Sequence, residues 1–592
     1  MNPLAAENVN YLWAQLLFAE WRRLGVAHVV ICPGSRSSPL AVAAARDGGL
    51  RVTVVLDERC AGFIALGVAK ASDSPAVVIT TSGTAVANLL PAAVEASVSG
   101  TPLLLVTADR PPELRECGAN QSIDQRDILG RFARWSFELP APSVDIDPTF
   151  VVSTANEAFC RATAWPPGPV HINAPFREPL APASGPMPII GDRLKKWMES
   201  GAPWRRELVQ SFWEPGNWPQ RLEERRILVV AGMGGTDMVR HAMNEDIPCI
   251  ADVTAMAGGR NEHWTFLSPY TTSTEDVHLP ATNSIPAADV ILAALADDQL
   301  TGLLERLRPE VVVRAGGPIS SKRVTEFLTR APRLIVERHI ARQDEKHAAT
   351  DVGTIRALSF DVDPDYLTLW RRVSSVASLA IHQAISEGDQ LTEPWIARNT
   401  ALRMRPGPLV VGSSMPVRDL DMFWPGDAAR ATRVLANRGA SGIDGTISTA
   451  VGVASALQAP TTVLLGDLAT LHDLGGLANV RSAGTPLDII TINNDGGAIF
   501  HFLPISREPA ATPHFERLFG TPHGLSFEHA AAMFGLGYRR ATTRDEFASA
   551  LADDGRTSGS RLIECVTDRS TNVEVHRAIQ RAVAHALVKE FA

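Results

Sequence analysis

The sequence predicts an α/β protein made of three doubly wound parallel sheets. Short apolar runs typical of buried strands alternate with helix-like runs, and this alternation occurs in three blocks along the chain. With 592 residues the chain is too long for a single hydrophobic core, and its length suggests about three or four domains of ordinary size. Irregular stretches separate the blocks, so each block is expected to form a domain.

The first block extends to about residue 190, and each of its strand-like runs precedes a helix-like or loop stretch. This order is typical of a parallel sheet covered by helices. The strand-like runs are HVVICPGS, RVTVVLDE, PAVVITTSGT, TPLLLVTADR and GPVHINAP. A stretch marked by Pro and Trp, GAPWRRELVQSFWEPGNWPQ at 201–220, then interrupts the pattern and is typical of a linker.

The second block begins with RRILVVAGMGG at 225, continues through PEVVVRAGG at 309 and ends near residue 345. Its VVAGMGG segment lacks the spacing of G-x-G-x-x-G and a suitably placed acidic residue, so we interpret it as a structural turn. After the helix-like run DYLTLWRRVSSVASLAIHQAI, the third block opens with GPLVVGSS near 407 and ends with SRLIECVTD.

The third block contains a βαβ unit that predicts a pair of neighbouring polar groups. One apolar run ends at Gly466 and Asp467, and the next, after leucines at roughly helical spacing, ends at Asn493 and Asn494. The carboxyl ends of parallel strands meet at one sheet edge, so Asp467 and Asn494 are expected near each other. Their oxygens suit a hard cation such as Mg²⁺, which completes its shell with ligand phosphates. Plain turns use the same residue types and are the alternative.

Composition and charge exclude several classes of protein. With 45% hydrophobic and 20% charged residues the chain resembles soluble globular proteins, and its net charge of −9 gives no electrostatic reason to expect nucleic acid. The six cysteines include no C-x-x-C pair, which favours reduced thiols and a cytoplasmic location over a zinc site or disulfides. No run is long and apolar enough to predict a membrane span.

Two loops of the first block suit a ligand. CPGSRSSP at 32–39 and TTSGT at 80–84 place hydroxyls and backbone N–H groups between a strand and a predicted helix. Such loops bind anions or heteroaromatic rings, although ordinary helix capping also explains either one alone.

Glu58 is a candidate for proton exchange. It is expected to end the strand VTVVL at 52–56, and Phe63 and Ile64 lie just beyond it. A carboxyl group in an apolar wall favours its protonated form and is suited to exchange a proton with a ligand nitrogen. An exposed charge cluster with Asp57 and Arg59 is the alternative.

These motifs together resemble the thiamine diphosphate (ThDP) enzymes of the pyruvate-decarboxylase type. Longer segments narrow the resemblance, namely ICPGSRSSPL, DERCAGFIALGVAK, TSGTAVANLLPAAVEA, TADRPPELRECGANQSIDQ, GSSMPVRDLD, NRGASGIDGTISTAVG and NNDGGAIFHFLP. Together they resemble the 2-succinyl-5-enolpyruvyl-6-hydroxy-3-cyclohexene-1-carboxylate (SEPHCHC) synthase family of menaquinone biosynthesis. The resemblance covers nearly the whole chain, although the middle block matches only in patches.

The resemblance implies three domains and a reaction. Residues 1–195 correspond to a pyrimidine-binding domain, 196–375 to a linker and a transhydrogenase-like middle domain, and 376–592 to a diphosphate-binding domain. The implied enzyme is a ThDP-dependent transferase. It decarboxylates 2-oxoglutarate and adds the succinyl carbanion equivalent, by 1,4-addition, to isochorismate. Leu468 replaces a glycine found in many relatives of the wider superfamily and agrees with the narrower family.

The resemblance also implies how the cofactor is held. Asp467, Asn494 and the Gly496 carbonyl would bind Mg²⁺ or Mn²⁺ against the diphosphate, beside Gly466. Glu58 would hydrogen-bond N1′ of the aminopyrimidine, and the bulky Ile443 would hold the two rings of ThDP in their folded conformation.

The substrates are dianions, which arginine side chains bind in a bidentate manner. By resemblance, the group near the 2-oxoglutarate-derived part comprises Ser414, Arg418 and Arg438, and the group on the isochorismate side comprises Ser35, Arg36, Arg110 and Gln121. The group that reaches in from the middle domain comprises Lys322 and Arg323, and the apolar walls comprise Phe500 and Leu503.

The resemblance further implies active sites between subunits, hence at least a homodimer and, as a dimer of dimers, a homotetramer. Two alternatives remain open from the sequence. One is another ThDP-dependent decarboxylase or ligase similar to acetohydroxyacid synthase. The other is a noncatalytic ThDP-binding regulator.

Overall fold

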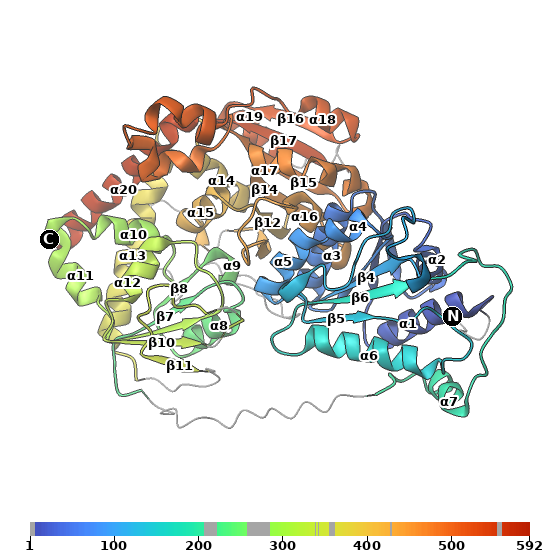
Figure 1. Cartoon of the computed structure of the whole chain (residues 1–592). Coiled ribbons are helices and arrows are strands. Elements are labelled where there is room, and N and C mark those ends of the chain that lie inside the picture. Colours follow the sequence, from blue (N-terminus) through green and yellow to red (C-terminus); the bar gives the residue numbers. More distant parts are fainter. Residues whose placement is uncertain are drawn as a thin grey trace. The chain divides into compact units, whose positions relative to one another are not determined.

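Three parallel β-sheets organise the part of the chain that the structure describes (Figure 1). This computed structural model describes residues 6–205, 222–256, 284–337, 339–340, 342–353, 361–426, 429–552 and 559–592. All pairings between the named strands are parallel. The predicted fold class is therefore confirmed, whereas most of the predicted linker at 201–220 lies outside the described residues.

The chain divides into two compact units. Unit 1 takes its described residues from Met1–Glu214, Asp444–Ala459 and Asp473–Thr485. Unit 2 takes its described residues from Pro215–Ile443, Pro460–His472 and Pro486–Ala592. The first sheet belongs to unit 1, and the second and third sheets belong to unit 2.

The first sheet has the strand order β2-β1-β3-β4-β6-β5. Its strands are β1 (His28–Ile31), β2 (Arg51–Val54), β3 (Ala76–Thr80), β4 (Leu103–Asp109), β5 (Trp135–Glu138) and β6 (Pro169–Pro175). Its helices are α1 (Val9–Arg23), α2 (Ser38–Arg46), α3 (Glu58–Ser72), α4 (Thr84–Ala87), α5 (Leu90–Ser99), α6 (Thr149–Thr163) and α7 (Asp192–Ser200). Helices α3 and α5 cover one face, while α1 and α6 lie on the other, as expected for a doubly wound sheet (Figure 1).

Unit 1 also includes α16 (Thr446–Leu457), which packs closely against α3. A Cβ atom at Gly67 would lie 2.0 Å from the Thr449 carbonyl oxygen. Glycine at this position therefore permits the two helix backbones to approach each other.

The second sheet has the strand order β11-β10-β9-β7-β8. Its strands are β7 (Ile227–Ala231), β8 (Cys249–Ala251), β9 (Val311–Ala315), β10 (Arg333–Glu337) and β11 (Asp351–Gly353). Its helices are α8 (Thr236–Asn244), α9 (Val253–Met256), α10 (Ala288–Ala294), α11 (Thr301–Leu307) and α12 (Lys322–Leu328). The VVAGMGG segment forms the turn between β7 and α8, as predicted.

The third sheet has the strand order β13-β12-β14-β15-β17-β16. Its strands are β12 (Gly407–Val411), β13 (Ala431–Ala436), β14 (Thr461–Gly466), β15 (Leu487–Asn493), β16 (Gly537–Ala541) and β17 (Arg561–Val566). The remaining helices of unit 2 are α13 (Pro364–Ser386), α14 (Glu393–Arg403), α15 (Met415–Met422), α17 (Asp467–His472), α18 (Glu528–Met533), α19 (Arg544–Leu551) and α20 (Arg569–Phe591).

The predicted βαβ unit is present, with a different connection. Strands β14 and β15 are adjacent and parallel. The link between them is the short α17 followed by a 3₁₀ helix, η6 (Leu474–Ala483), rather than one continuous α-helix. Between these two helices, the Asp473 side chain accepts the Ser448 N–H at 2.7 Å. Gly475 and Gly476 follow, and glycine has a low propensity for a continuous α-helix.

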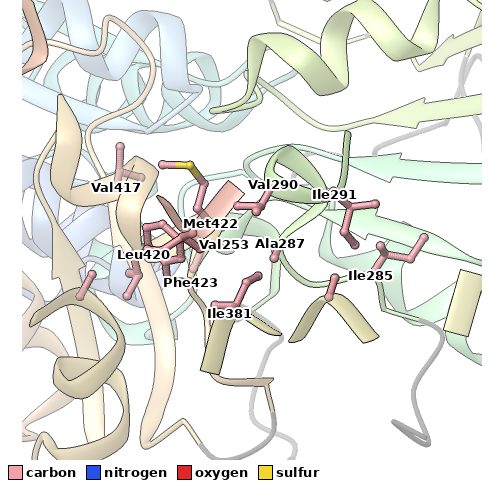
Figure 2. Packing of buried hydrophobic residues seen from close by; sticks show 14 of the residues in the cluster. Val253, Ile285, Ala287, Val290, Ile291, Ile381, Val417, Leu420, Met422 and Phe423 are labelled. Atoms are coloured by element: carbon pink, nitrogen blue, oxygen red, sulfur yellow. The ribbon is translucent and has the colours of Figure 1, made fainter. Parts of the chain in front are cut away.

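One hydrophobic core joins the second and third sheets within unit 2 (Figure 2). Val253 of α9 and the segment around Ala287 contribute from the second sheet, and Leu420 and Phe423 contribute from α15 and its end. Ile381 of α13 packs into the same cluster. The shared core means that side chains of the two sheets keep fixed positions relative to one another.

None of the helices in the described ranges combines the length and apolar composition that a membrane crossing requires. The cysteines are unbonded, and all of them are buried except Cys117. Burial raises the pKa of the Cys60 thiol to about 12, which agrees with a structural role for this side chain.

Candidate active site

Polar side chains follow four neighbouring strands at the carboxyl edge of the third sheet. Arg438 follows β13, Ser414 follows β12, Asp467 follows β14 and Asn494 follows β15. The strand order reverses between β12 and β14, and doubly wound sheets bind ligands at such a reversal. The topology thus gathers these predicted residues at one edge.

Asp467 is buried and accepts four hydrogen bonds from residues that the structure describes. Its Oδ2 accepts the Asn494 N–H at 3.1 Å and the Gly496 N–H at 2.9 Å, and it lies 3.2 Å from His523 Nε2. Among the described residues, its Oδ1 accepts a hydrogen bond only from the Leu468 N–H, at 2.6 Å, which leaves a lone pair for a ligand. Burial raises the pKa of Asp467, and the hydrogen bonds from Gly496 and His523 oppose this shift.

The Asn494 side chain has one amide atom paired and the other unpaired. Its Nδ2 donates to Glu393 Oε1 at 2.8 Å. Its Oδ1 is buried and has no hydrogen-bond partner among the described residues. A buried oxygen without a partner is costly, and this atom is therefore suited to bind a ligand.

Gly496 completes a set of three oxygen donors. Its backbone φ is +132°, and a Cβ atom there would lie 1.9 Å from the Gly520 carbonyl oxygen, so only glycine fits. Within the described ranges its own carbonyl accepts a single N–H, from Ala498 at 3.0 Å. A carboxylate, an amide oxygen and a backbone carbonyl form the donor chemistry that Mg²⁺ prefers, so these residues fit the implied metal.

Two arginines lie beside this oxygen cluster on the same sheet edge. Arg418 Nη1 donates to the Ser414 carbonyl at 2.5 Å. Burial lowers the pKa of Arg418, and the positive charge of Arg438 lowers it further. No salt bridge joins a carboxylate to either arginine in the described parts of the chain. The carboxylates of Asp419, Asp289 and Asp252 act on Arg418 from a greater distance and favour its charged form. Two neighbouring arginines that lack a direct salt bridge in the described chain suit an anion such as a carboxylate.

The other predicted residues of the third sheet surround this edge. Ile443 is half-buried in the loop between β13 and α16. Gly466 is the last residue of β14. Phe500 lies in the 3₁₀ helix that follows the Asn494 loop, with its ring centroid 5.4 Å from that of Phe519, and Leu503 is partly exposed just after this helix.

Glu58 is the first residue of α3 and not a strand end, because β2 stops at Val54. Its carboxyl is half-buried, and its Oε2 lies 3.4 Å from Asn88 Nδ2. Asp57 caps the helix instead by accepting the Arg59 N–H at 2.9 Å. Asp57 therefore caps the helix, and the Glu58 side chain does not take part in this capping.

The structure brings two of the four predicted isochorismate-side residues, Arg110 and Gln121, into contact with Ser82. Arg110 donates to the Ser82 hydroxyl, and Gln121 Nε2 donates to the Ser82 carbonyl at 2.8 Å. Burial lowers the pKa of Arg110, and the nearby Arg36 lowers it further. Ser35 is exposed in the turn before α2. This cluster of donors suits an anionic ligand.

Lys322 and Arg323 are exposed at the start of α12. Arg323 pairs with Asp289 at 2.7 Å, so its charge already has a partner. The Asp289 carboxylate also raises the pKa of Arg418 against the effect of burial. The fold therefore brings this helix start toward the arginine pair within unit 2.

Comparisons with known proteins show to which family the chain belongs. Residues 13–128 match the family described as "Thiamine pyrophosphate enzyme, N-terminal TPP binding domain". SEPHCHC synthases from Salinibacter ruber and Rubrobacter xylanophilus are 39% and 41% identical to the chain, over 99% and 97% of it and 98% of each relative. The SEPHCHC synthase of Myxococcus xanthus is 38% identical over 98% of both chains. The chain belongs to the SEPHCHC synthase family.

Membership confirms the narrower resemblance and makes the chain a ThDP-dependent transferase. It also decides between the alternatives left open by the sequence at the level of the family. The chain belongs to the SEPHCHC synthases rather than to a family similar to acetohydroxyacid synthase or to a family of noncatalytic regulators.

Several residues of the site are not among those predicted. Glu393 is buried, and burial together with the charge of Asp419 raises its pKa to about 8. His523 Nδ1 accepts the Leu525 N–H at 3.0 Å, so the ring proton is on Nε2 and is donated to Asp467. Thr392 and Glu393 are typical of a helix start, and no sequence pattern connects either residue with the site.

Proposed function

We propose that the chain decarboxylates 2-oxoglutarate and transfers the remaining succinyl unit, by 1,4-addition, to isochorismate, giving SEPHCHC and CO₂. The names of the relatives support the product. The observation that carries the proposal is the joint presence, in the described chain, of an amide oxygen of Asn494 without a hydrogen-bond partner and a pair of arginines, Arg418 and Arg438, that no salt bridge joins to a carboxylate.

The oxygen cluster of the third sheet is proposed to anchor the cofactor. Asp467 Oδ1, Asn494 Oδ1 and the Gly496 carbonyl would hold Mg²⁺ or Mn²⁺ against the diphosphate group. Burial of these donors excludes water and strengthens their attraction for a cation. ThDP, when bound, supplies the electron sink that makes loss of CO₂ from a 2-oxo acid possible.

The arginines are proposed to orient the two substrates. Arg418, Arg438 and Ser414 would bind the 2-oxoglutarate-derived part. Arg36 and Arg110 of the first sheet would bind carboxylates of isochorismate, with Ser35 and Gln121 beside them. Lys322 and Arg323 would contribute after Arg323 exchanges Asp289 for the substrate.

Glu58 is proposed as the group that shares a proton with N1′ of the aminopyrimidine. Glu58 is half-buried, and its carboxyl does not cap the helix, so it is suited to form a short hydrogen bond to a ring nitrogen. Ile443, Phe500 and Leu503 would supply the apolar walls. We further propose that the active protein is a homodimer or homotetramer with sites completed between subunits.

Turnover measurements test the proposal. Purified protein with ThDP and Mg²⁺ should release CO₂ from 2-oxoglutarate and form the succinylated adduct, identified by mass, only when isochorismate is present. Pyruvate is the control substrate. Efficient turnover of pyruvate, or no isochorismate-dependent adduct, would refute the proposal.

A further inference from the structure

Glu393 holds the amide of Asn494 in one orientation. Its side chain is buried at the first position of α14, far along the chain from Asn494. Its Oε1 accepts Asn494 Nδ2 at 2.8 Å and the Thr567 hydroxyl at 3.4 Å. An oxygen that accepts from two donors must face the nitrogen of the amide, and the Asn494 oxygen therefore points elsewhere.

The neighbouring asparagine provides an internal comparison. Asn493 Nδ2 also donates to a buried glutamate, Glu564 Oε1, at 2.6 Å. The Asn493 oxygen, however, accepts the Asp495 N–H at 3.2 Å. Both amides are fixed by a glutamate, and only that of Asn494 leaves its oxygen without a partner in the described chain.

We propose that Glu393 is a positioning residue, which orients the Asn494 amide so that its oxygen faces the divalent cation. The inference rests on the metal site of the proposed function and assigns a role to Glu393, which contacts one of the proposed metal ligands without binding the metal itself. An unrestrained amide can rotate and present its NH₂ group to a cation, which repels it. Residues that orient metal ligands typically contribute about 10- to 100-fold in metal affinity.

Substitutions at position 393 separate orientation from packing. Glu393→Met fills a similar volume without an acceptor, and Glu393→Asp keeps the carboxylate but shortens the side chain by one methylene. Glu393→Gln retains an acceptor oxygen of the same reach. Glu564→Gln is the matched control, because it changes the glutamate that holds the neighbouring asparagine.

The readout is binding of Mn²⁺, used as a paramagnetic probe. Full-length protein freed of metal is titrated with Mn²⁺ at saturating ThDP, and free Mn²⁺ is followed by electron paramagnetic resonance. We expect Glu393→Met and Glu393→Asp to weaken Mn²⁺ binding by about 10- to 100-fold. Glu393→Gln and Glu564→Gln should remain within about threefold of the unmodified protein, well below that loss.

The outcomes distinguish this inference from the proposed function. Unchanged Mn²⁺ affinity in Glu393→Met or in Glu393→Asp, with normal binding by the unmodified protein, overturns the inference and leaves the proposed function standing. Equal weakening in Glu564→Gln also overturns it, because the effect would then be general loosening. If the unmodified protein binds no Mn²⁺ with ThDP, the proposed metal site fails and the inference fails with it.

Discussion

The first and third sheets have the same strand order and different chemistry at their carboxyl edges. In each sheet the order is second, first, third, fourth, sixth and fifth strand of that sheet. After the third strand, the first sheet has the hydroxyl residues Thr81 and Ser82, whereas the third sheet has the buried carboxylate of Asp467. The first edge offers mainly hydrogen-bond donors, and the third offers acceptor oxygens beside two arginines.

This difference shows how one topology serves two tasks. The strand order decides where a ligand site forms, because the carboxyl ends of neighbouring strands converge. The few residues after each strand decide what the site attracts. Donor groups at the first edge suit a carboxylate, and the oxygen cluster at the third suits a cation with its phosphate partner.

Substitution of Asp467 should remove the cation site of the third sheet and have the largest effect. Asp467→Asn replaces a carboxylate oxygen by an NH₂ group, and we expect turnover to fall by about 10³-fold, equivalent to about 4 kcal/mol. Turnover at increasing Mg²⁺ and ThDP measures this. Asp495→Asn, in the same loop and partly exposed, is the control. Equal loss in both variants would mean that loop geometry, and not the carboxylate charge, is responsible.

Substitution of Glu58 tests an acid that follows a strand of the first sheet. Glu58→Gln should preserve the fold and ThDP binding but lower turnover by about 100-fold or more, since it removes proton exchange. Steady-state kinetics and ThDP titration check both parts. Asp57→Asn changes the adjacent helix cap and should leave turnover nearly unchanged. Near-normal activity of Glu58→Gln would exclude Glu58 from the reaction.

A crossed pair of substitutions should separate the two substrates. Arg418→Ala is expected to raise KM for 2-oxoglutarate by about 10- to 100-fold, because a charge-assisted bidentate contact is lost. Arg110→Ala should raise KM for isochorismate to a similar extent. Initial rates with each substrate varied in turn provide the measurement. If both variants alter the same KM, the assignment of one substrate to each sheet edge is wrong.

Asp473 should affect pH-dependent stability with the smallest change in turnover. Burial raises the pKa of Asp473 from its usual 3.8 to about 6, partly offset by hydrogen bonds from Ser448. In this window the native carboxyl retains a proton that the unfolded chain has released, so stability falls as pH rises from about 4 to about 6. Urea unfolding of Asp473→Asn should lack this part of the slope. An unchanged slope would show that Asp473 does not cause it.

Much of the fold follows from local sequence. The named strand-like runs, from HVVI to RLIECV, coincide with β1, β17 and several of the strands between them, most of which are buried. The strands that were not predicted individually include β5, β8, β11, β13 and β16, which lie at sheet edges. Four of these five have partly exposed residues in the described chain, for example throughout β5. Edge strands need fewer apolar residues and therefore leave a weaker pattern.

In the candidate site, too, the sequence predicts some features and not others. The meeting of Asp467 with Asn494 follows from two apolar runs and the rule that parallel strands align their carboxyl ends. The domain boundaries at 195 and 375 and the roles of the individual site residues stay predictions. The start of α3 at Glu58 differs from the expected strand end, because Asp57 caps a helix there.

The sequence by itself determined the fold class, the family and the positions after strands where polar groups collect. Local patterns of apolar residues suffice for the strands, because they indicate which segments are buried and where each strand ends. Only the tertiary structure decided which partners complete those groups. Glu393 meets Asn494, and Gln121 meets Ser82, across long stretches of chain. Hydrogen bonds between such distant residues depend on packing of the whole domain and leave no local pattern to read.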